Sequence, residues 1–343
     1  MRGIPVILVL MGFLQALLDA VFGKRADSAH TPLPLPLQAT DNARLEPSSP
    51  RVLLITFNPV VDGERGTRMI EYMGWNAVEP LVQGYISDVR ACSAGLVNYQ
   101  IVERIEVDDW IPLEDGYRYD GATFLQVMDR RAAPHKPDMM DYNWCIEKFD
   151  LVNRVMRNEI DEVWMFAFPY GGFYESRMVG EDAYWCNAPA LDQVDCRRRF
   201  VMMGFNYERG VGEMEEAFGH RIESIMTRVY ERKSAAANIY KHFITYDKQS
   251  PGMAQVGWMH YAPNSHTDYD WGNRSVVTSA CDDWLNYPNL SGATRQVSTG
   301  DWGNGDIRAH HTWWFNRLPH VAGRVDGIRC NWWHYAIHLD PFA

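Results

Sequence analysis

Several motifs are missing from this chain of 343 residues, and each absence argues against a class of function. Its six cysteines form no C-x-x-C pair, which argues against a metal cluster held by thiolates. Ser176 does not lie in a G-x-S-x-G sequence, so a serine hydrolase has little support. Lys and Arg number only 33 against 44 Asp and Glu. The resulting net charge of −11 argues against a nucleic-acid binder or a general binder of anionic membranes, and no nucleotide cofactor is indicated.

The N-terminus has the pattern of a targeting segment. Arg2 precedes an apolar run over residues 4–23, and Lys24 and Arg25 close it. The run is long for the core of a signal peptide, just long enough to span a bilayer, and lacks a clear small-x-small cleavage site. We expect residues 1–25 to be a removed signal peptide or, alternatively, an uncleaved membrane anchor. Either places the rest outside the cytoplasm, secreted or at the cell surface. The proline-rich residues 26–50 predict a linker.

Export also predicts disulfide bonds among the cysteines. Cys186 and Cys196 form the best pair, because they bracket a polar loop that closes easily. The other four could form two further bonds whose connectivity the sequence leaves open; they are Cys92, Cys145, Cys281 and Cys330.

Alternating apolar runs and helical periodicities predict an α/β domain over residues 51–261, with a largely parallel central sheet. Residues 262–343 lose this pattern and predict a long irregular Trp/His-rich region packed on the same domain. Eight of the 13 Trp and seven of the 11 His lie between Trp258 and His338, and such a region is typical of a binding surface. The expected strands are 52–59, 98–107, 162–168, 199–205 and 255–261; the expected helices are 68–73, 80–90, 143–158 and 211–233.

The expected helix over residues 211–233 carries the first candidate site. Glu216, His220 and Glu223 share one face at 100° per residue, together with other acidic and hydroxyl side chains but no lysine. An imidazole with carboxylates four residues before it and three after it can point at one metal ion. The alternative interpretation is an ordinary polar face exposed to solvent.

A second candidate site is a pair of glutamates that follow expected strands. Glu175 comes after the strand 162–168 and its loop, and Glu208 directly follows the strand 199–205. Ligands of α/β sheets bind outside the carboxyl ends of strands, and Tyr174 flanks one of these acids. The pair could provide the acid and base, or the acid and nucleophile, of glycoside hydrolysis. In the alternative, Glu208 caps the next helix and pairs with an arginine.

Aromatic residues of the C-terminal region form the third set of candidates. Trp271 follows His266, Asp268 and Asp270, whose spacing by two would put them on one side of an extended segment. Trp313 and Trp314 could stack on sugar rings or, in the alternative, pack in the core.

Four segments resemble stretches of exported bacterial proteins known only as hypothetical. They are FAFPYGGFYESRM, GFNYERGVGEMEEAFGHRIESIM, WMHYAPNSHTDYDW and DWLNYPN, within about residues 50–338. The resemblance implies export and no particular activity or ligand.

These observations favour a secreted metal-dependent hydrolase that acts on an extracellular polymer, peptide or glycan, through a metal-activated water. His220 and Glu223 would hold a divalent metal, most simply zinc, and Glu216 or Glu175 would accept the proton. Two alternatives remain: a metal-free glycoside hydrolase using Glu175 and Glu208, and a non-catalytic glycan- or surface-binding protein. No nucleic-acid partner is expected, and a membrane only through the possible anchor. The further metal ligand would come from His310 or His311, or from His260 or His266; Tyr174, Trp271, Trp313 and Trp314 would bind the substrate.

Overall fold

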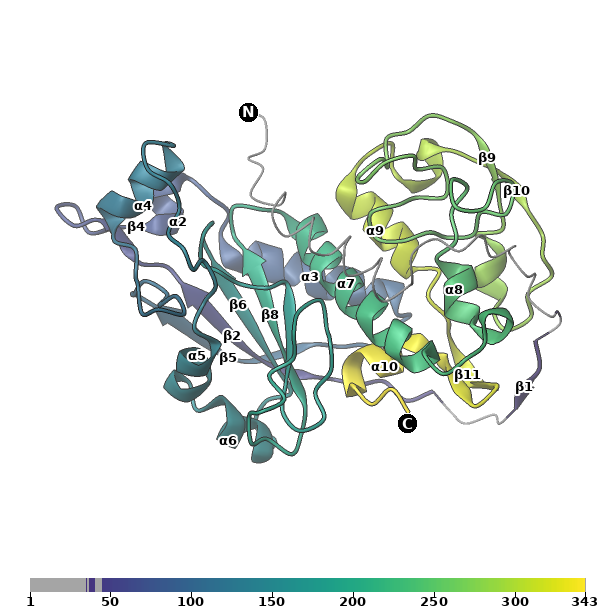
Figure 1. Cartoon of the computed structure of the whole chain (residues 1–343), viewed down its shortest axis with the longest axis horizontal. Coiled ribbons are helices and arrows are strands. Elements are labelled where there is room, and N and C mark those ends of the chain that lie inside the picture. The colour runs from purple at the N-terminus through teal and green to yellow at the C-terminus, as the bar shows by residue number, and fades with distance from the viewer. Residues whose placement is uncertain (1–34, 36, 41–44, 343) are drawn as a thin grey trace.

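The computed structural model describes residues 35, 37–40 and 45–342, and the predicted signal peptide or anchor lies outside them. Its centre is a five-stranded sheet with the order β5-β2-β6-β8-β7 (Figure 1). The first four strands are parallel to one another, and β7 pairs with β8 in the antiparallel sense. The predicted α/β fold with a mostly parallel sheet is therefore confirmed.

Four expected strands appear close to their predicted bounds. Three of them are apolar runs that a two-sided layer can bury, and the fourth, β5, alternates polar and apolar residues at the edge of the sheet. β6 (Glu162–Ala167) is buried at every residue. Phe57 of β2 contacts Phe149 on one face of the sheet, whereas Trp164 contacts Tyr85 on the other. The short edge strand β7 (Ser176–Val179) was not predicted. The other sheet strands are β2 (Arg51–Phe57), β5 (Gln100–Val107) and β8 (Phe200–Asn206).

The predicted helices are found, with one division. The expected helix 143–158 is two helices, α5 (Tyr142–Lys148) and α6 (Leu151–Met156), because Asp150 between them has a left-handed φ of 52°. The remaining helices are α2 (Met69–Met73), α3 (Val78–Cys92), α4 (Gly121–Met128), α7 (Val211–Tyr230), α8 (Ile239–Phe243), α9 (Ile307–Phe315) and α10 (Trp332–His338).

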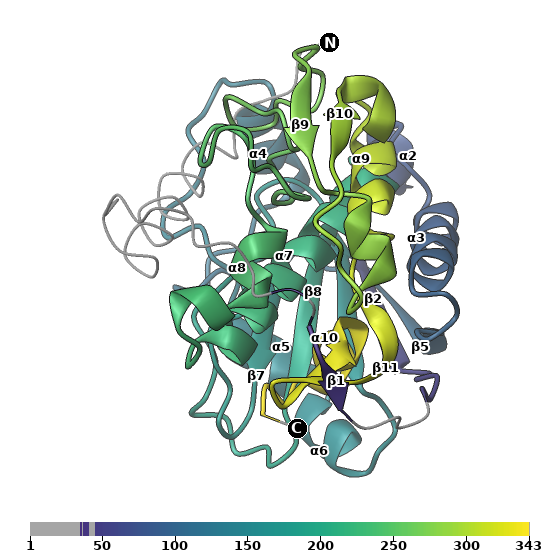
Figure 2. The same ribbon diagram turned by 90° about the vertical axis from the view of Figure 1, so that its right-hand side faces the viewer.

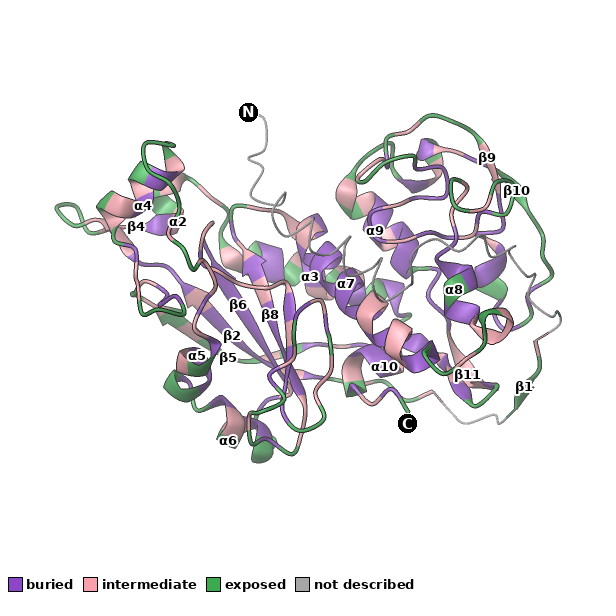
Figure 3. Ribbon diagram, in the orientation of Figure 1, coloured by how far each residue is buried: buried purple, intermediate pink, exposed green. Residues whose placement is uncertain are grey.

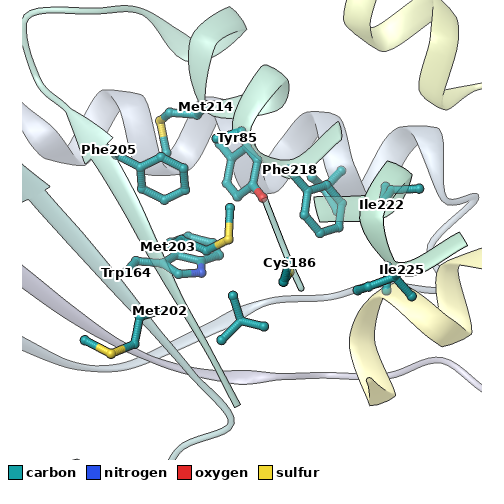
Figure 4. Packing of buried hydrophobic residues seen from close by; sticks show 14 of the residues in the cluster. Tyr85, Trp164, Cys186, Met202, Met203, Phe205, Met214, Phe218, Ile222 and Ile225 are labelled. Carbon is teal, nitrogen blue, oxygen red and sulfur yellow. The ribbon is translucent and has the colours of Figure 1, made fainter. Parts of the chain in front are cut away.

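Helix α7 lies between the sheet and the C-terminal part of the chain (Figure 1). It packs on β7, β8 and α3 with one side and on α8, α9 and α10 with the rest. Phe218 and Ile222 of α7 lie near Trp164 in the cluster above the sheet (Figure 4). Of the 20 residues of this helix 14 are buried, so α7 is mostly coloured as buried in Figure 3. Its acidic, histidine-bearing face consequently turns toward protein and not toward bulk water.

The C-terminal part contains more regular structure than the sequence suggests. The expected strand 255–261 is wrong: this segment forms turns with only isolated bridges, such as Trp258 to Tyr261. Beyond it lie two hairpins, β9 (Val277–Ser279) with β10 (Arg295–Val297), and β11 (His320–Val325) with β12 (Ile328–Asn331). β1 (Ala39–Thr40), within the expected linker, adds to β11 (Figure 2). A small hairpin of β3 (Val60–Asp62) and β4 (Thr67–Arg68) and three short 3-10 turns, η1 (Ala235–Ala237), η2 (Asp283–Asn286) and η3 (Thr299–Trp302), complete the elements.

All six cysteines are free, buried thiols, and the structure contains none of the expected disulfide bonds. Burial raises the pKa of Cys186 to about 11, which keeps this thiol protonated and unreactive at neutral pH. Among the helices of the described residues, none combines the length and the apolar character needed to cross a membrane.

Candidate metal centre

Two histidines and one glutamate converge where α7 meets the turn that follows residue 257. The Nε2 atoms of His220 and His260 are 2.8 Å apart, and Nε2 of His260 is 3.0 Å from Oε1 of Glu216. The third edge, from His220 Nε2 to Glu216 Oε1, measures 4.0 Å. All three residues are buried. Three potential ligand atoms thus lie within 4.8 Å of one another in a site closed from bulk water.

A carboxylate holds each imidazole from the opposite side of the ring. Nδ1 of His220 lies 2.8 Å from Glu223, and Nδ1 of His260 lies 3.0 Å from Asp268. Glu223 is itself fixed, because its second oxygen accepts the backbone N–H of Met259 at 2.8 Å. Each Nδ1 therefore carries the proton and donates it to its carboxylate, which leaves the Nε2 lone pairs directed at each other. Metal-binding histidines are held by carboxylates in this way.

Two imidazole lone pairs 2.8 Å apart repel each other unless a proton or a cation lies between them. Burial opposes protonation of His260, but the hydrogen bonds to Asp268 and Glu216 outweigh it and raise its pKa to about 10. Burial likewise disfavours the Glu216 carboxylate, yet the hydrogen bond from His260 lowers its pKa to about 2. The hydroxyl of Tyr269 also donates to Glu216 Oε1, at 2.8 Å. The site is built around one positive charge at the point where the Nε2 atoms meet.

The triangle is close to the size that a metal ion such as zinc requires. Zinc binds nitrogen and oxygen ligands at roughly 2.0–2.2 Å, so two ligand atoms at a tetrahedral angle lie about 3.4 Å apart. The three observed separations, 2.8, 3.0 and 4.0 Å, bracket that value. Small rotations of Glu216 and of the two rings would equalise them. Three ligands would leave the fourth position open, which is the arrangement of catalytic zinc sites.

Glu175 lies beside this centre, and the other predicted glutamate does not. Its Oε2 accepts a hydrogen bond from Asn187 at 2.5 Å, and its charge interacts with those of His220, Glu216 and His260. Burial raises its pKa above the ordinary value. Glu208, in contrast, is exposed beyond the end of β8. The two acids of the predicted glycosidase pair therefore have different surroundings. Glu208 does not cap α7 either, because the carboxylate that accepts the N–H of Gly210 belongs to Glu213.

None of the other predicted histidine ligands belongs to the triangle, although His311 is close enough to interact electrostatically with Glu216, His260 and His220. His266 is exposed on the surface. His310 and His311 are fully buried and pack against Trp271, with ring centroids 5.1 and 5.2 Å away. Nδ1 of His311 donates to the carbonyl of Gly212 at 3.0 Å, and its Nε2 has no hydrogen-bond partner within the described chain. Burial lowers the pKa of His311 to about 4, so both of these rings are neutral core residues.

The predicted substrate-binding aromatics are mainly part of the core. Trp271, Trp313 and Trp314 are no more than 8 % exposed, and Trp314 Nε1 donates to the carbonyl of Gly257 at 2.8 Å. Protein covers these ring faces, so the structure gives no support to a sugar-stacking role for the three residues. Tyr174 is half-buried, and the guanidinium of Arg177 lies over its ring, 5.5 Å from the centroid.

The sequence grouped Glu216, His220 and Glu223, which the structure brings together, and it left the remaining residues of the cluster open. His260 was one of several candidate ligands, because nothing in the spacing of 40 residues singles it out. Asp268 was noted only as one of three polar residues spaced by two, and Tyr269 was not considered. No family model, no curated protein and no solved structure matches this chain. The geometry of the site is therefore the basis of any functional inference.

Proposed function

We propose that this protein is a metal-dependent hydrolase in which Glu216, His220 and His260 hold a divalent cation, most simply zinc. The observation that carries the proposal is the pairing of each imidazole with its own carboxylate, which directs two Nε2 lone pairs at one point beside Glu216. A polar cluster with a purely structural role would satisfy both nitrogens of each ring with separate donors or acceptors. Here Nε2 of His260 contacts both Glu216 and Nε2 of His220, so two rings and one carboxylate meet at a single point.

The surrounding residues fit the remaining roles of such a site. A bound zinc ion lowers the pKa of its water ligand to about 7. Glu175 is the proposed proton acceptor, since its raised pKa suits a general base near neutral pH. Glu223, which the sequence suggested as a ligand, and Asp268 are assigned instead as positioning residues that hold the two rings. Tyr269 restrains Glu216 through its hydroxyl.

The proposed substrate is an extracellular polymer, peptide or glycan, acted on after export of the chain. Two observations weigh against the alternatives. Glu175 interacts electrostatically with the histidine centre, whereas Glu208 interacts with Arg209 and Glu213, so a metal-free pair of catalytic glutamates lacks convergence. A non-catalytic glycan binder would need exposed aromatic faces, and the tryptophans first considered for that purpose are buried.

Elemental analysis of the purified protein tests the proposal. We expect about one zinc ion per chain, lost in His220→Ala and in Glu216→Gln. His266→Ala is the matched control, because it removes an exposed imidazole outside the centre and should leave the zinc content unchanged. Hydrolysis of casein and of a polysaccharide panel would be followed with and without chelator. Absence of a stoichiometric ion, or full activity after chelation, would reject the metal mechanism.

A further inference from the structure

A second, basic site lies at the amino ends of the parallel strands. There a groove of about 1130 Å³ separates the residues that lead into β2 and β8 from the β11–β12 hairpin and α10. Helix α10 and strand β11 are seen at the lower edge of the molecule, beneath α7 (Figure 1). None of the proposed metal ligands, nor Glu175, lines this groove. It is therefore a site separate from the candidate metal centre.

The groove concentrates positive charge on an otherwise acidic protein. Its lining contains six arginines and only three acidic residues, although the whole chain has a net charge of −11. One of the acids, Asp161, is shared by two of the arginines. Arg51 Nε and Nη2 donate to its two oxygens at 2.9 Å, and Arg198 donates to Oδ1, which it shares with Arg51 Nη2. A single carboxylate thus faces two guanidinium groups and leaves one positive charge uncompensated.

Two further arginines of the groove have no side-chain partner among the described residues. The side chains of Arg197 and Arg329 make no hydrogen bond or ion pair within the part of the chain that the structure describes. The positive charge of the arginines also affects a histidine of α10 in the same lining. Burial, and then repulsion from His338, Arg329 and Arg324, lower the pKa of His334 to about 4. The groove therefore contains guanidinium donors whose positive charge is not fully compensated by acidic residues.

We propose that this groove binds a multivalent oxyanion that carries phosphate or sulfate groups, with Arg197 and Arg329 as its principal donors. The planar guanidinium fork matches the oxygens of such groups and binds them in bidentate fashion. A volume of about 1130 Å³ accommodates a ligand much larger than one phosphate or sulfate ion, and the opposing walls place arginines on both sides of it. The site is independent of the proposed hydrolase activity.

Calorimetric titration at low ionic strength tests this site with two probes, sodium tripolyphosphate and sucrose octasulfate. We expect one molecule of at least one probe to bind per chain, and the tighter probe identifies the preferred oxyanion. Arg197→Gln should weaken binding about tenfold, and Arg197→Gln with Arg329→Gln about a hundredfold. Arg65→Gln is the matched control, since the side chain of Arg65 is 83 % exposed on the β3–β4 hairpin, and it should bind the probes as the unaltered protein does.

Three results would overturn the assignment. The first is that neither probe binds. The second is an equal loss of affinity in Arg197→Gln and Arg65→Gln, which would indicate only diffuse attraction. This comparison does not depend on the partly buried Arg329, because Arg197 is exposed and the single variant Arg197→Gln should fold. The third uses the metal centre: Glu216→Gln should bind the probes as the unaltered protein does, and loss of binding in this variant would place the anion on the metal ion.

Discussion

Zinc and a proton should compete for the same place between His220 and His260. In the metal-free protein the Nε2 atoms 2.8 Å apart share one proton, because each Nδ1 already donates to a carboxylate. With that proton His260 is an imidazolium, whose pKa is about 10. Binding of a metal ion must expel the proton. Because the pKa of His220 is raised as well, we expect zinc binding to release at least one proton per ion. From His260 alone, the zinc affinity should rise about tenfold for each unit by which the pH rises, up to about pH 10.

The size of this competition follows from the pKa of His260. The pKa of His260 is about three units above pH 7, and each unit of pKa corresponds to about 1.4 kcal/mol. The proton thus weakens the apparent zinc affinity at pH 7 by about 1000-fold, or about 4 kcal/mol. Between pH 6 and pH 8 the affinity should rise about 100-fold. An unperturbed histidine with a pKa near 6.5 would give only about a fourfold change over the same range.

Titration calorimetry in two buffers of different ionisation enthalpy measures both the affinity and the proton released. Asp268→Asn removes one of the charges that raise the pKa of His260, so its pH dependence should be flatter. Asp192→Asn changes the same chemistry at an exposed position and serves as the control. Affinity that does not vary with pH, or binding without proton release, would refute the shared-proton arrangement.

Three further variants test the packing around the site. A Cβ at Gly219 would lie 2.3–2.4 Å from three side-chain atoms of Met259, so Gly219→Ala should displace the turn beside His260 and weaken zinc binding at least tenfold by calorimetry. Glu215 is fully buried, and burial together with the nearby Asp88 raises its pKa to about 10. Because the unfolded chain ionises this acid from about pH 4.5 upward, Glu215→Gln should raise the free energy of unfolding at pH 7 by up to about 3 kcal/mol in urea titrations, with no gain at pH 4. Trp314→Ala should lower that free energy by about 3–5 kcal/mol, in agreement with a core role.

The sheet and most helices could be predicted because their apolar periodicity is a local property. Strands such as 162–168 are apolar at nearly every position, which fits a layer buried on both faces, and the structure buries β6 completely. The division at Asp150 could not be predicted, since it depends on one left-handed residue inside a continuous helical pattern. The segment 255–261 was misassigned for a related reason: Gly257 takes a left-handed φ of 91° and turns the chain within a mostly apolar stretch.

The candidate site was only partly predictable, because half of it is not local. Glu216, His220 and Glu223 share a helix, so their common face followed from helical geometry. The sequence could not distinguish ligand from positioning residue, which depends on whether a carboxylate contacts Nδ1 or Nε2 of the ring. His260 reaches the helix only through the fold of a turn 40 residues away. The sequence could not separate a core role from a binding role for the tryptophans, because a large apolar side chain suits a core as well as a binding surface.

The same proton makes the metal-free protein stable at neutral pH and labile in alkali. Three carboxylates contact the two imidazoles, namely Glu216, Glu223 and Asp268. Protonated His260 reduces their combined charge from −3 to −2, and a divalent cation between neutral rings would reduce it to −1. A proton can therefore partly replace the ion, and we expect the chelated protein to remain folded at pH 7.

The pKa of His260 is raised on folding, so its contribution to stability is fully present below the unfolded value of about 6.5 and is lost as pH rises through about 10. The free energy of unfolding of the metal-free protein should fall by up to about 5 kcal/mol across that window, because deprotonation leaves two lone pairs and three carboxylates facing one another. The zinc-loaded protein has no such proton to lose and should show little of this decline. Urea titrations at pH 6.5, 8 and 9.5 with and without zinc measure the difference. Parallel losses in the two forms would mean that the ion and the proton do not occupy the same place.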